Sequence, residues 1–297
     1  MDFSGFVVQG LNGLAGASSL FLVAAGLSLI FGVTRIVNFA HGSFFMLGIY
    51  LAYTLIEHLG RSWGLAWSIW PLLIAAALAT GLLGGLIEIW VLRRIYKAPE
   101  LFQLLGTFAL VLIIKDAALW IWGPEDLLGP RVPGLAGSID VLGRRFPTYE
   151  LFLMVVGPVV LGLLWMLLTR TRYGTLIRAA TQDREMVGAL GIHQRWLFTA
   201  VFALGCALAG LGGVLWGLSQ PPVVPPIGGP VHVLLFLVII MGGLGSTLGS
   251  LVGAVLVGLM ANYTGFLAPK VALFSNIALM VAVLLWRPQG LYPVAKR

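Results

Sequence analysis

The sequence contains few charged residues and a single cysteine. Charged side chains make up 10% of the 297 residues, whereas a soluble domain carries roughly 25%. Cys206 lies inside an apolar run and has no second cysteine with which to form a disulfide. The four histidines are scattered without the spacing of metal ligands. These shortages argue against a large soluble domain, a disulfide scaffold and a metal site.

Motifs for nucleotide binding and catalysis are also missing. The glycine-rich stretch 242–246 lacks the lysine that completes a phosphate-binding loop. No Gly-x-Ser-x-Gly elbow or pair of catalytic acids occurs. We therefore expect no enzyme activity, no bound cofactor and no ATP binding by this chain. The net charge of +7 does not point to nucleic acid, because the basic residues lie in short gaps between apolar runs.

Long apolar runs fill most of the chain. Hydrophobic residues account for 59% of it, and a bilayer core about 30 Å thick is crossed by about 20 helical residues. The runs are continuous rather than alternating, which favours helices over a β-barrel. The sequence predicts an all-α, polytopic transmembrane bundle of about 8–9 spans, forming one membrane domain over residues 1–297. The expected spans lie near 6–33, 39–58, 65–92, 101–122, 150–169, 197–218, 231–243, 248–266 and 272–287.

The distribution of basic residues predicts the orientation. If Arg93 and Arg94 face the cytoplasm, twelve Lys and Arg residues fall inside and five outside, as the positive-inside rule requires. The N-terminus is then outside and the C-terminus cytoplasmic, with an outer loop at about 123–149 and a cytoplasmic segment at about 170–195. The run 231–243 is short for a span, so it could be tilted, broken or re-entrant, and a re-entrant segment would reverse this parity.

Polar residues within spans are costly and usually face protein or a water-filled path. Asn38 and His41 open the second span, where Asn38 can cap the first turn and a neutral, hydrogen-bonded His41 can lie at an inner gate. Glu88 could pair with Lys115 as a structural lock, and a proton relay is the alternative. The densely placed glycines favour close helix packing, although they could also let helices slide. Further candidates for a translocation path are Gln9, Asn12, Gln103, Thr107 and Asn262.

The cytoplasmic segment has an amphipathic pattern. Residues 175–191 are expected to form one short helix, and Gly191 is a helix-stop residue. Such a helix could lie on the lipid surface or dock in a groove of another protein. The apolar candidates for contact are Met186, Val187, Leu190 and Ile192, and the polar rim consists of Arg178, Asp183, Arg184 and Glu185.

This segment resembles the coupling loop of bacterial ABC importer permeases. Glu185-Met186-Val187-x-x-x-Gly191 is similar to their EAA-x-x-x-G motif, with Met186 and Val187 in place of the paired alanines. The string Asn38-Phe39-Ala40-His41-Gly42 is similar to the LivH-like branch of branched-chain amino acid permeases. Further similar stretches lie in family order at 26–32, 178–192, 209–214 and 242–246.

The resemblance implies a permease subunit in the bacterial inner membrane. Such a subunit pairs with a second, related permease as a heterodimer. Two separate ATPase subunits, which use ATP-Mg, would contact residues 178–192, and a periplasmic binding protein would deliver the solute. The transported solute would be a branched-chain or related amino acid, moved by alternating access. A stand-alone, ion-coupled secondary transporter is the alternative, and a structural membrane subunit without a path is a third possibility.

Overall fold

The computed structural model describes residues 3–60, 69–125, 127, 132–219 and 228–293, apart from the side chains of Arg184, residues 228–230 and Leu273. Its helices and strands are, in chain order, α1 (Phe3–Thr34), α2 (His41–Leu55), η1 (Ile56–Gly60), α4 (Ile69–Ile87), η3 (Glu88–Leu92), α5 (Arg93–Ile95), α6 (Glu100–Trp122), β1 (Ser138–Val141), β2 (Arg144–Pro147), α7 (Thr148–Arg170), α8 (Arg172–Gln182), α9 (Arg184–Ala189), α10 (Gln194–Ser219), α11 (Gly228–Gly242), α12 (Thr247–Leu267), η5 (Pro269–Val271) and α13 (Ala272–Trp286).

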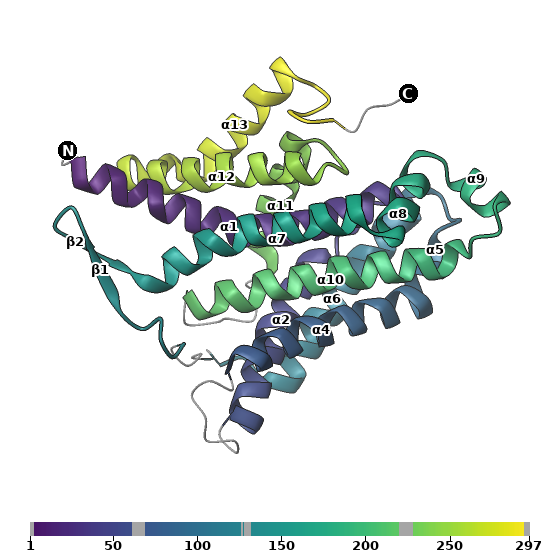
Figure 1. The fold of residues 1–297 in the computed structure, drawn as a ribbon, viewed down its shortest axis with the longest axis horizontal. Helices are drawn as coiled ribbons and strands as arrows, with labels where there is room; N and C mark the ends of the chain where they lie inside the picture. Colours follow the sequence, from purple (N-terminus) through teal and green to yellow (C-terminus); the bar gives the residue numbers. More distant parts are fainter. Residues whose placement is uncertain (1–2, 61–68, 126, 128–131, 220–227, 294–297) are drawn as a thin grey trace.

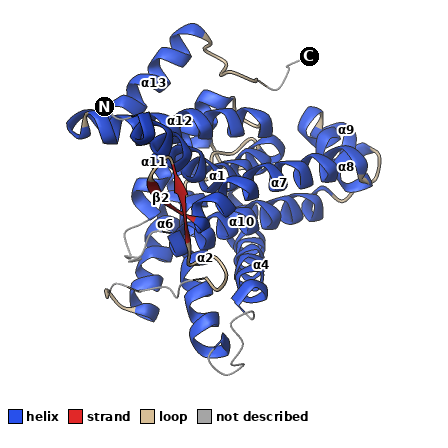
Figure 2. Cartoon of the chain, turned by 60° about the vertical axis from the view of Figure 1, so that its left-hand side comes forward, coloured by secondary structure: helices blue, strands red, loops and turns tan. Residues whose placement is uncertain are grey.

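The helical bundle confirms the predicted fold class (Figures 1 and 2). Within the described residues, seven helical segments are long and apolar enough to cross a membrane: 3–34, 41–60, 69–95, 100–122, 148–170, 194–219 and 247–267. The apolar helices 231–242 and 274–286 are shorter. Each of the nine apolar runs therefore has a helical counterpart, and the chain is a multi-pass membrane protein.

Helix α1 lies at the centre of the bundle, in contact with α7, α10 and α12. Its residues from Phe21 to Ile30 are all buried. Helix α10 packs in turn on α2 and α4. Helices α6 and α7 are buried over only 22% of their most apolar windows, because their leucine, valine and aromatic side chains face outward as a lipid-facing surface would.

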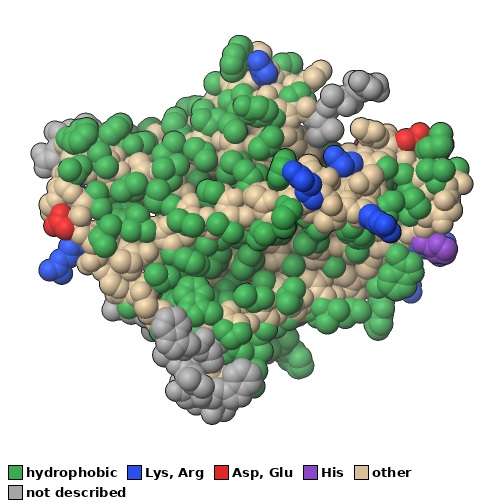
Figure 3. Space-filling view, viewed as in Figure 1, with side chains coloured by type: hydrophobic (Ala, Val, Ile, Leu, Met, Phe, Trp, Pro, Cys, Tyr) green, Lys and Arg blue, Asp and Glu red, His purple; other side chains and the backbone are tan. Residues whose placement is uncertain are grey.

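The two ends of the bundle differ. At one end the hairpin β1–β2 lies beside the start of α1, where Arg144 Nε donates a 3.2 Å hydrogen bond to Ser4 Oγ. At the other end α8 and α9 project from α7 and α10. Figure 3 shows that most of the visible basic side chains gather toward this second end, while hydrophobic side chains cover most of the face between the ends. The hairpin was not expected from the sequence, which predicted only a loop at 123–149.

Helix α11 finishes at the α8–α9 end. Gly242 packs against Gly249 at the start of α12, and Gly245 lies beside Gly32 near the end of α1. Helix α10 instead finishes at the hairpin end, where the Leu215 carbonyl accepts a 2.8 Å hydrogen bond from Tyr149. Ser219 and Gly242 thus lie toward opposite ends of the bundle, and the connection between α10 and α11 includes residues outside the described part of the structure.

The C-terminal residues also return to the α8–α9 end. The Leu291 and Tyr292 amides donate to the Met241 and Gly242 carbonyls at 2.8 and 2.9 Å. The described ends of the chain therefore lie at opposite ends of the bundle. Which end faces the cytoplasm stays a prediction.

Candidate functional site

The segment between α7 and α10 forms two helices rather than the single predicted helix. The helix breaks at Asp183, whose backbone is extended and whose side chain accepts a 3.0 Å hydrogen bond from the Met186 amide. Asp is a strong N-cap because its carboxylate satisfies an otherwise free amide in the first turn. The expectation of one continuous helix over 175–191 was wrong because this local hydrogen bond starts a second helix.

The turn at Gly191 agrees with its predicted role. Helix α9 ends at Ala189, and Gly191 follows with φ of +81°. This left-handed conformation is the usual end of a helix and is costly for residues with a Cβ. The chain then enters α10 at Gln194.

The apolar side chains of α8 and α9 divide into two sets. Val187 is buried in a cluster with Ile177 of α8 and Leu197 of α10, and Ile192 packs against this cluster. In contrast, Met186 is 58% exposed and Leu190 is 72% exposed. Val187 and Ile192 therefore fix the segment to its own bundle, which leaves Met186 and Leu190 as the outward apolar contacts.

The polar candidates of this segment lie around that surface. Arg178, Asp183 and Glu185 are exposed. Arg184 begins α9, but its side chain lies outside the described part of the structure. Arg35, which follows α1 with φ of +56°, donates to the Thr181 carbonyl of α8 at 3.3 Å and so ties α8 to the end of α1.

A narrow hollow with room for about one water molecule lies among the end of α1, the α1–α2 connection, η3, α5, α6 and α10. It is lined by Ile30, Thr34, Ile36, Asn38, Leu92, Ile95, Tyr96, Thr107 and Phe202, and the atoms that face it are apolar. The Asn38 side-chain oxygen accepts from the Ala40 amide at 3.0 Å, whereas its Nδ2 is buried without a hydrogen-bond partner. The hollow thus unites two of the predicted path residues, Asn38 and Thr107.

The other predicted path and gate residues lie elsewhere. His41 is buried, and its Nε2 is 3.0 Å from the Val23 carbonyl oxygen of α1. Gln103 Nε2 donates to the Ala98 carbonyl at 2.8 Å, within the turn before α6. Three further candidates are only partly buried and lie in the halves of α1 and α12 nearer the hairpin: Gln9, Asn12 and Asn262.

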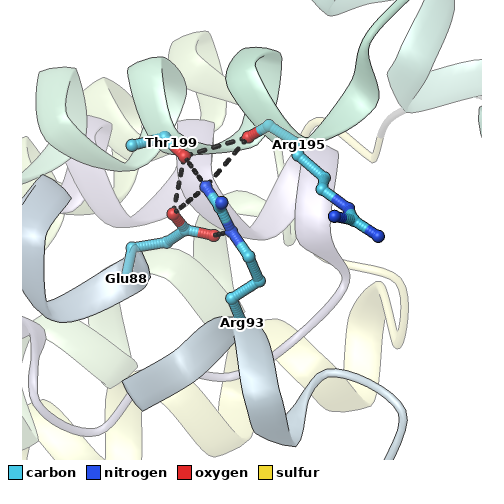
Figure 4. A network of polar contacts seen from close by, with 4 residues as sticks. All are labelled: Glu88, Arg93, Arg195 and Thr199. Carbon is cyan, nitrogen blue, oxygen red and sulfur yellow. Dashed lines mark hydrogen bonds and ion pairs between the residues drawn. The ribbon is translucent and has the colours of Figure 1, made fainter. Parts of the chain in front are cut away.

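A charged network lies where η3 and α5 meet α10, and the amino-acid sequence did not reveal its partners. Glu88 is fully buried, and its carboxylate binds Arg93 at 3.0 Å and Thr199 at 2.6 Å (Figure 4). The predicted partner Lys115 is instead exposed on α6. Glu88 and Arg93 are five residues apart, which is not a same-face spacing on an α-helix, so sequence spacing did not indicate the pair.

The described residues contain no group of three or more His, Cys, Asp or Glu side chains placed to hold a metal ion. The geometry is that of a multi-pass helical membrane protein with an exposed apolar patch on a compact pair of helices at one end. This geometry places the chain in the class of polytopic helical membrane proteins.

Residues 10–284 match the family described as the branched-chain amino acid transport system / permease component. The chain belongs to this family of transport permeases, which are not enzymes. No solved structure matches the chain.

Two kinds of permease resemble the chain over most of its length. It is 28% identical to the high-affinity branched-chain amino acid transport system permease protein BraD of Pseudomonas aeruginosa, over 96% of this chain and 95% of BraD. It is 25% identical to the LivH permease protein of Escherichia coli K12, over 98% and 96%. The LivM permease protein of the same organism is 23% identical, over 98% of this chain and 72% of LivM.

Proposed function

We propose that the chain is the permease subunit of an ATP-driven importer and forms part of the path for branched-chain or related amino acids. The observation that carries this function is the α8–α9 segment. Buried Val187 anchors it, while Met186 and Leu190 present an apolar patch outward. Such a patch on a fixed helix pair suits the groove of a partner protein. The matching family and its relatives support the transported class.

The proposed partners follow from the relatives and from the absence of a nucleotide-binding loop. The similarity to both LivH and LivM supports a second, related permease beside this chain. Two ATPase subunits would supply ATP-Mg hydrolysis at the α8–α9 end, and a periplasmic binding protein would deliver the amino acid at the hairpin end. In this proposal the chain would lie in the bacterial inner membrane with its N-terminus outside.

The hollow lined by Asn38 and Thr107 is proposed as the closed inner end of the path. Its size admits no amino acid, so the surrounding helices must separate before a solute leaves. Gln9, Asn12 and Asn262 would lie toward the outer part of the path. Because the binding protein supplies selectivity, the membrane path should bind leucine only weakly, and tight leucine binding to the isolated permease would contradict this part of the proposal.

The test is reconstitution of this chain with its partner permease, the two ATPases and the binding protein in liposomes. We expect leucine uptake that requires ATP. The double substitution of Met186 and Leu190 by Ser should abolish co-purification of the ATPases. Leu142→Ser is the control, because Leu142 is 57% exposed at the opposite end, between β1 and β2.

Each outcome separates the alternatives. ATPases that still co-purify with the double variant would show that α8–α9 is not the docking surface. Leucine uptake by this chain alone, driven by an ion gradient without ATP, would identify a secondary transporter instead.

A further inference from the structure

Glu88 is a fully buried acid that no step of the proposed transport requires. Burying a charged side chain is costly unless it is paired and hydrogen-bonded. Replacing a buried ion pair by apolar residues is often neutral or stabilising, so stability alone gives a weak reason for the network. Its position between helices suggests a mechanical role.

The pair depends on a local departure from the α-helix. Residues five apart on an α-helix lie about 140° apart around its axis. Glu88–Leu92 forms a π-helical turn, η3, and the Arg93 amide donates to the Glu88 carbonyl. This wider turn brings Arg93 over Glu88, where its guanidinium reaches the carboxylate at 3.0 Å. Single π-turns within α-helices are frequent at functional sites.

Thr199 of α10 joins this pair from the other helix. Its hydroxyl has two acceptors within reach, Glu88 Oε2 at 2.6 Å and the Arg195 carbonyl at 2.9 Å. Arg93 donates to the Thr199 hydroxyl and to the Arg195 carbonyl. Figure 4 shows Glu88 and Arg93 converging on the first turns of α10. The network therefore bonds η3 to the part of α10 that directly follows the α8–α9 segment.

That part of α10 is also where α8 and α9 are fixed. Leu197, Phe198 and Val201 of α10 pack with Ile177 and Val187 in one buried cluster. A displacement of α8–α9 must therefore carry the start of α10 with it, because the close-packed cluster cannot deform freely.

The other side of the network reaches the hollow. Tyr96 follows α5 and lines the hollow together with Asn38 and Thr107. Burial and the neighbouring Glu88 carboxylate raise the pKa of Tyr96 above its ordinary value. Glu88 thus lies between the start of α10 and the wall of the hollow.

We propose that Glu88, Arg93 and Thr199 form a clamp that transmits movement of the α8–α9 segment to α4 and to the hollow. The three are positioning residues, and this role rests on the proposed function. A packing role alone would require only that the helices stay together. Transmission requires that the hydrogen bonds of Glu88 and Arg93 to the start of α10 stay formed while α10 moves.

Thr199→Val tests the clamp, because it removes the hydroxyl at nearly constant volume. The matched control is Thr80→Val on α4. Thr80 is also buried, also donates to the carbonyl four residues earlier, at 2.8 Å, and also faces α10 at Gly210, but among the described residues its hydroxyl makes no hydrogen bond to another helix. Thr199→Ser keeps the hydroxyl and should restore the wild-type behaviour.

The measurement is leucine taken up per ATP hydrolysed by the reconstituted complex. We expect Thr199→Val to assemble with its partners and hydrolyse ATP, but to lower this ratio roughly tenfold, as the loss of one hydrogen bond to a charged group can do. Thr80→Val and Thr199→Ser should keep the wild-type ratio. If Thr199→Val does not assemble, Arg93→Lys is measured, which keeps the charge but loses the guanidinium's second contact.

The outcomes distinguish the two proposals. A ratio for Thr199→Val equal to that of Thr80→Val, in an active wild-type background, would overturn the clamp and leave the proposed function standing. A wild-type ratio in Arg93→Lys would overturn it equally when that variant is used. A wild-type complex without ATP-dependent uptake would overturn the proposed function and the clamp together.

Discussion

The crossing of α1 and α10 gives the sharpest prediction for stability. A Cβ added to Gly205 would lie 2.6 Å from the Ile30 side chain and 2.7 Å from the Gly26 carbonyl oxygen. Ile30 is itself almost fully buried, so its side chain has no solvent to turn into. Gly205→Ala must therefore separate the two helices or distort the core between them.

The magnitude follows from these distances. Apolar carbons rest at about 3.5–4.0 Å, so the contact with Ile30 is short by roughly 1 Å. Overpacking of this kind costs about 1–3 kcal/mol. The better helix propensity of alanine returns up to about 1 kcal/mol. With the full propensity gain, we expect Gly205→Ala to destabilise the protein by up to about 2 kcal/mol.

The assay is thermal unfolding of the purified protein in detergent, followed by intrinsic tryptophan fluorescence. The control is Gly162→Ala on α7, where an added Cβ has no neighbour within 4 Å, so only the propensity gain applies. Gly205→Ala should melt several degrees below the wild type and Gly162→Ala at or above it. Equal melting temperatures for the two variants would refute the reasoning that glycine permits this helix contact.

Three further predictions concern the α8–α9 segment and the start of α2. Gly191→Val has space for its side chain but not the backbone freedom, so it should cost about 1–2 kcal/mol and speed amide hydrogen exchange over residues 184–192, whereas Gly191→Asn should do so less. Asp183→Ala removes the cap of α9 and should cost about 1 kcal/mol, seen as faster exchange at Met186, while Asp183→Asn should keep the protection. Asn38→Ala leaves the Ala40 amide without its acceptor and should cost about 1–3 kcal/mol; unchanged melting and unchanged uptake together would contradict this role.

The sequence predicted the helical segments well because their signal is local. The length and apolar composition of one segment are enough to predict that it can span a membrane as a helix, whatever the rest of the chain does. The glycines behaved as expected for packing, since an added Cβ on Gly205, Gly210 or Gly253 would meet another helix at close range. The turn at Gly191 was predictable for the same reason, because a helix stop depends on one residue type.

The parts that sequence did not reveal depend on competition or on distance. Asp183 was expected inside a single helix, but its carboxylate accepts a hydrogen bond from the Met186 amide and so caps the start of a second helix. Val187 was assigned to a partner's groove, yet α10 lies close enough to bury it. Opposite charge suggested Lys115 as one possible partner of Glu88, whereas Thr199 lies 111 residues away in sequence and no pattern in either helix links them.

Helix α10 has the contacts needed to act as the moving element of the proposed importer. It begins directly after α9, and its glycines lie against three other helices: Gly205 against α1, Gly213 against Phe45 of α2 and Gly210 against Thr80 of α4. Gly213 faces the backbone of Phe45, Gly205 faces the Gly26 carbonyl and the buried Ile30 side chain, and Gly210 faces the buried Thr80 side chain, so little free space is left to absorb a shift. A movement at the start of α10 must therefore either pass to all three helices or break their contacts, and the clamp at Glu88 favours its passage to α4. Gly210→Ala should therefore lower stability and uptake together, whereas Thr199→Val should lower uptake per ATP hydrolysed by more than its loss of stability explains, which is about 1.5–3 kcal/mol for a hydrogen bond to a charged group. Parallel losses of stability and uptake in both variants would mean that α10 is a packing element only.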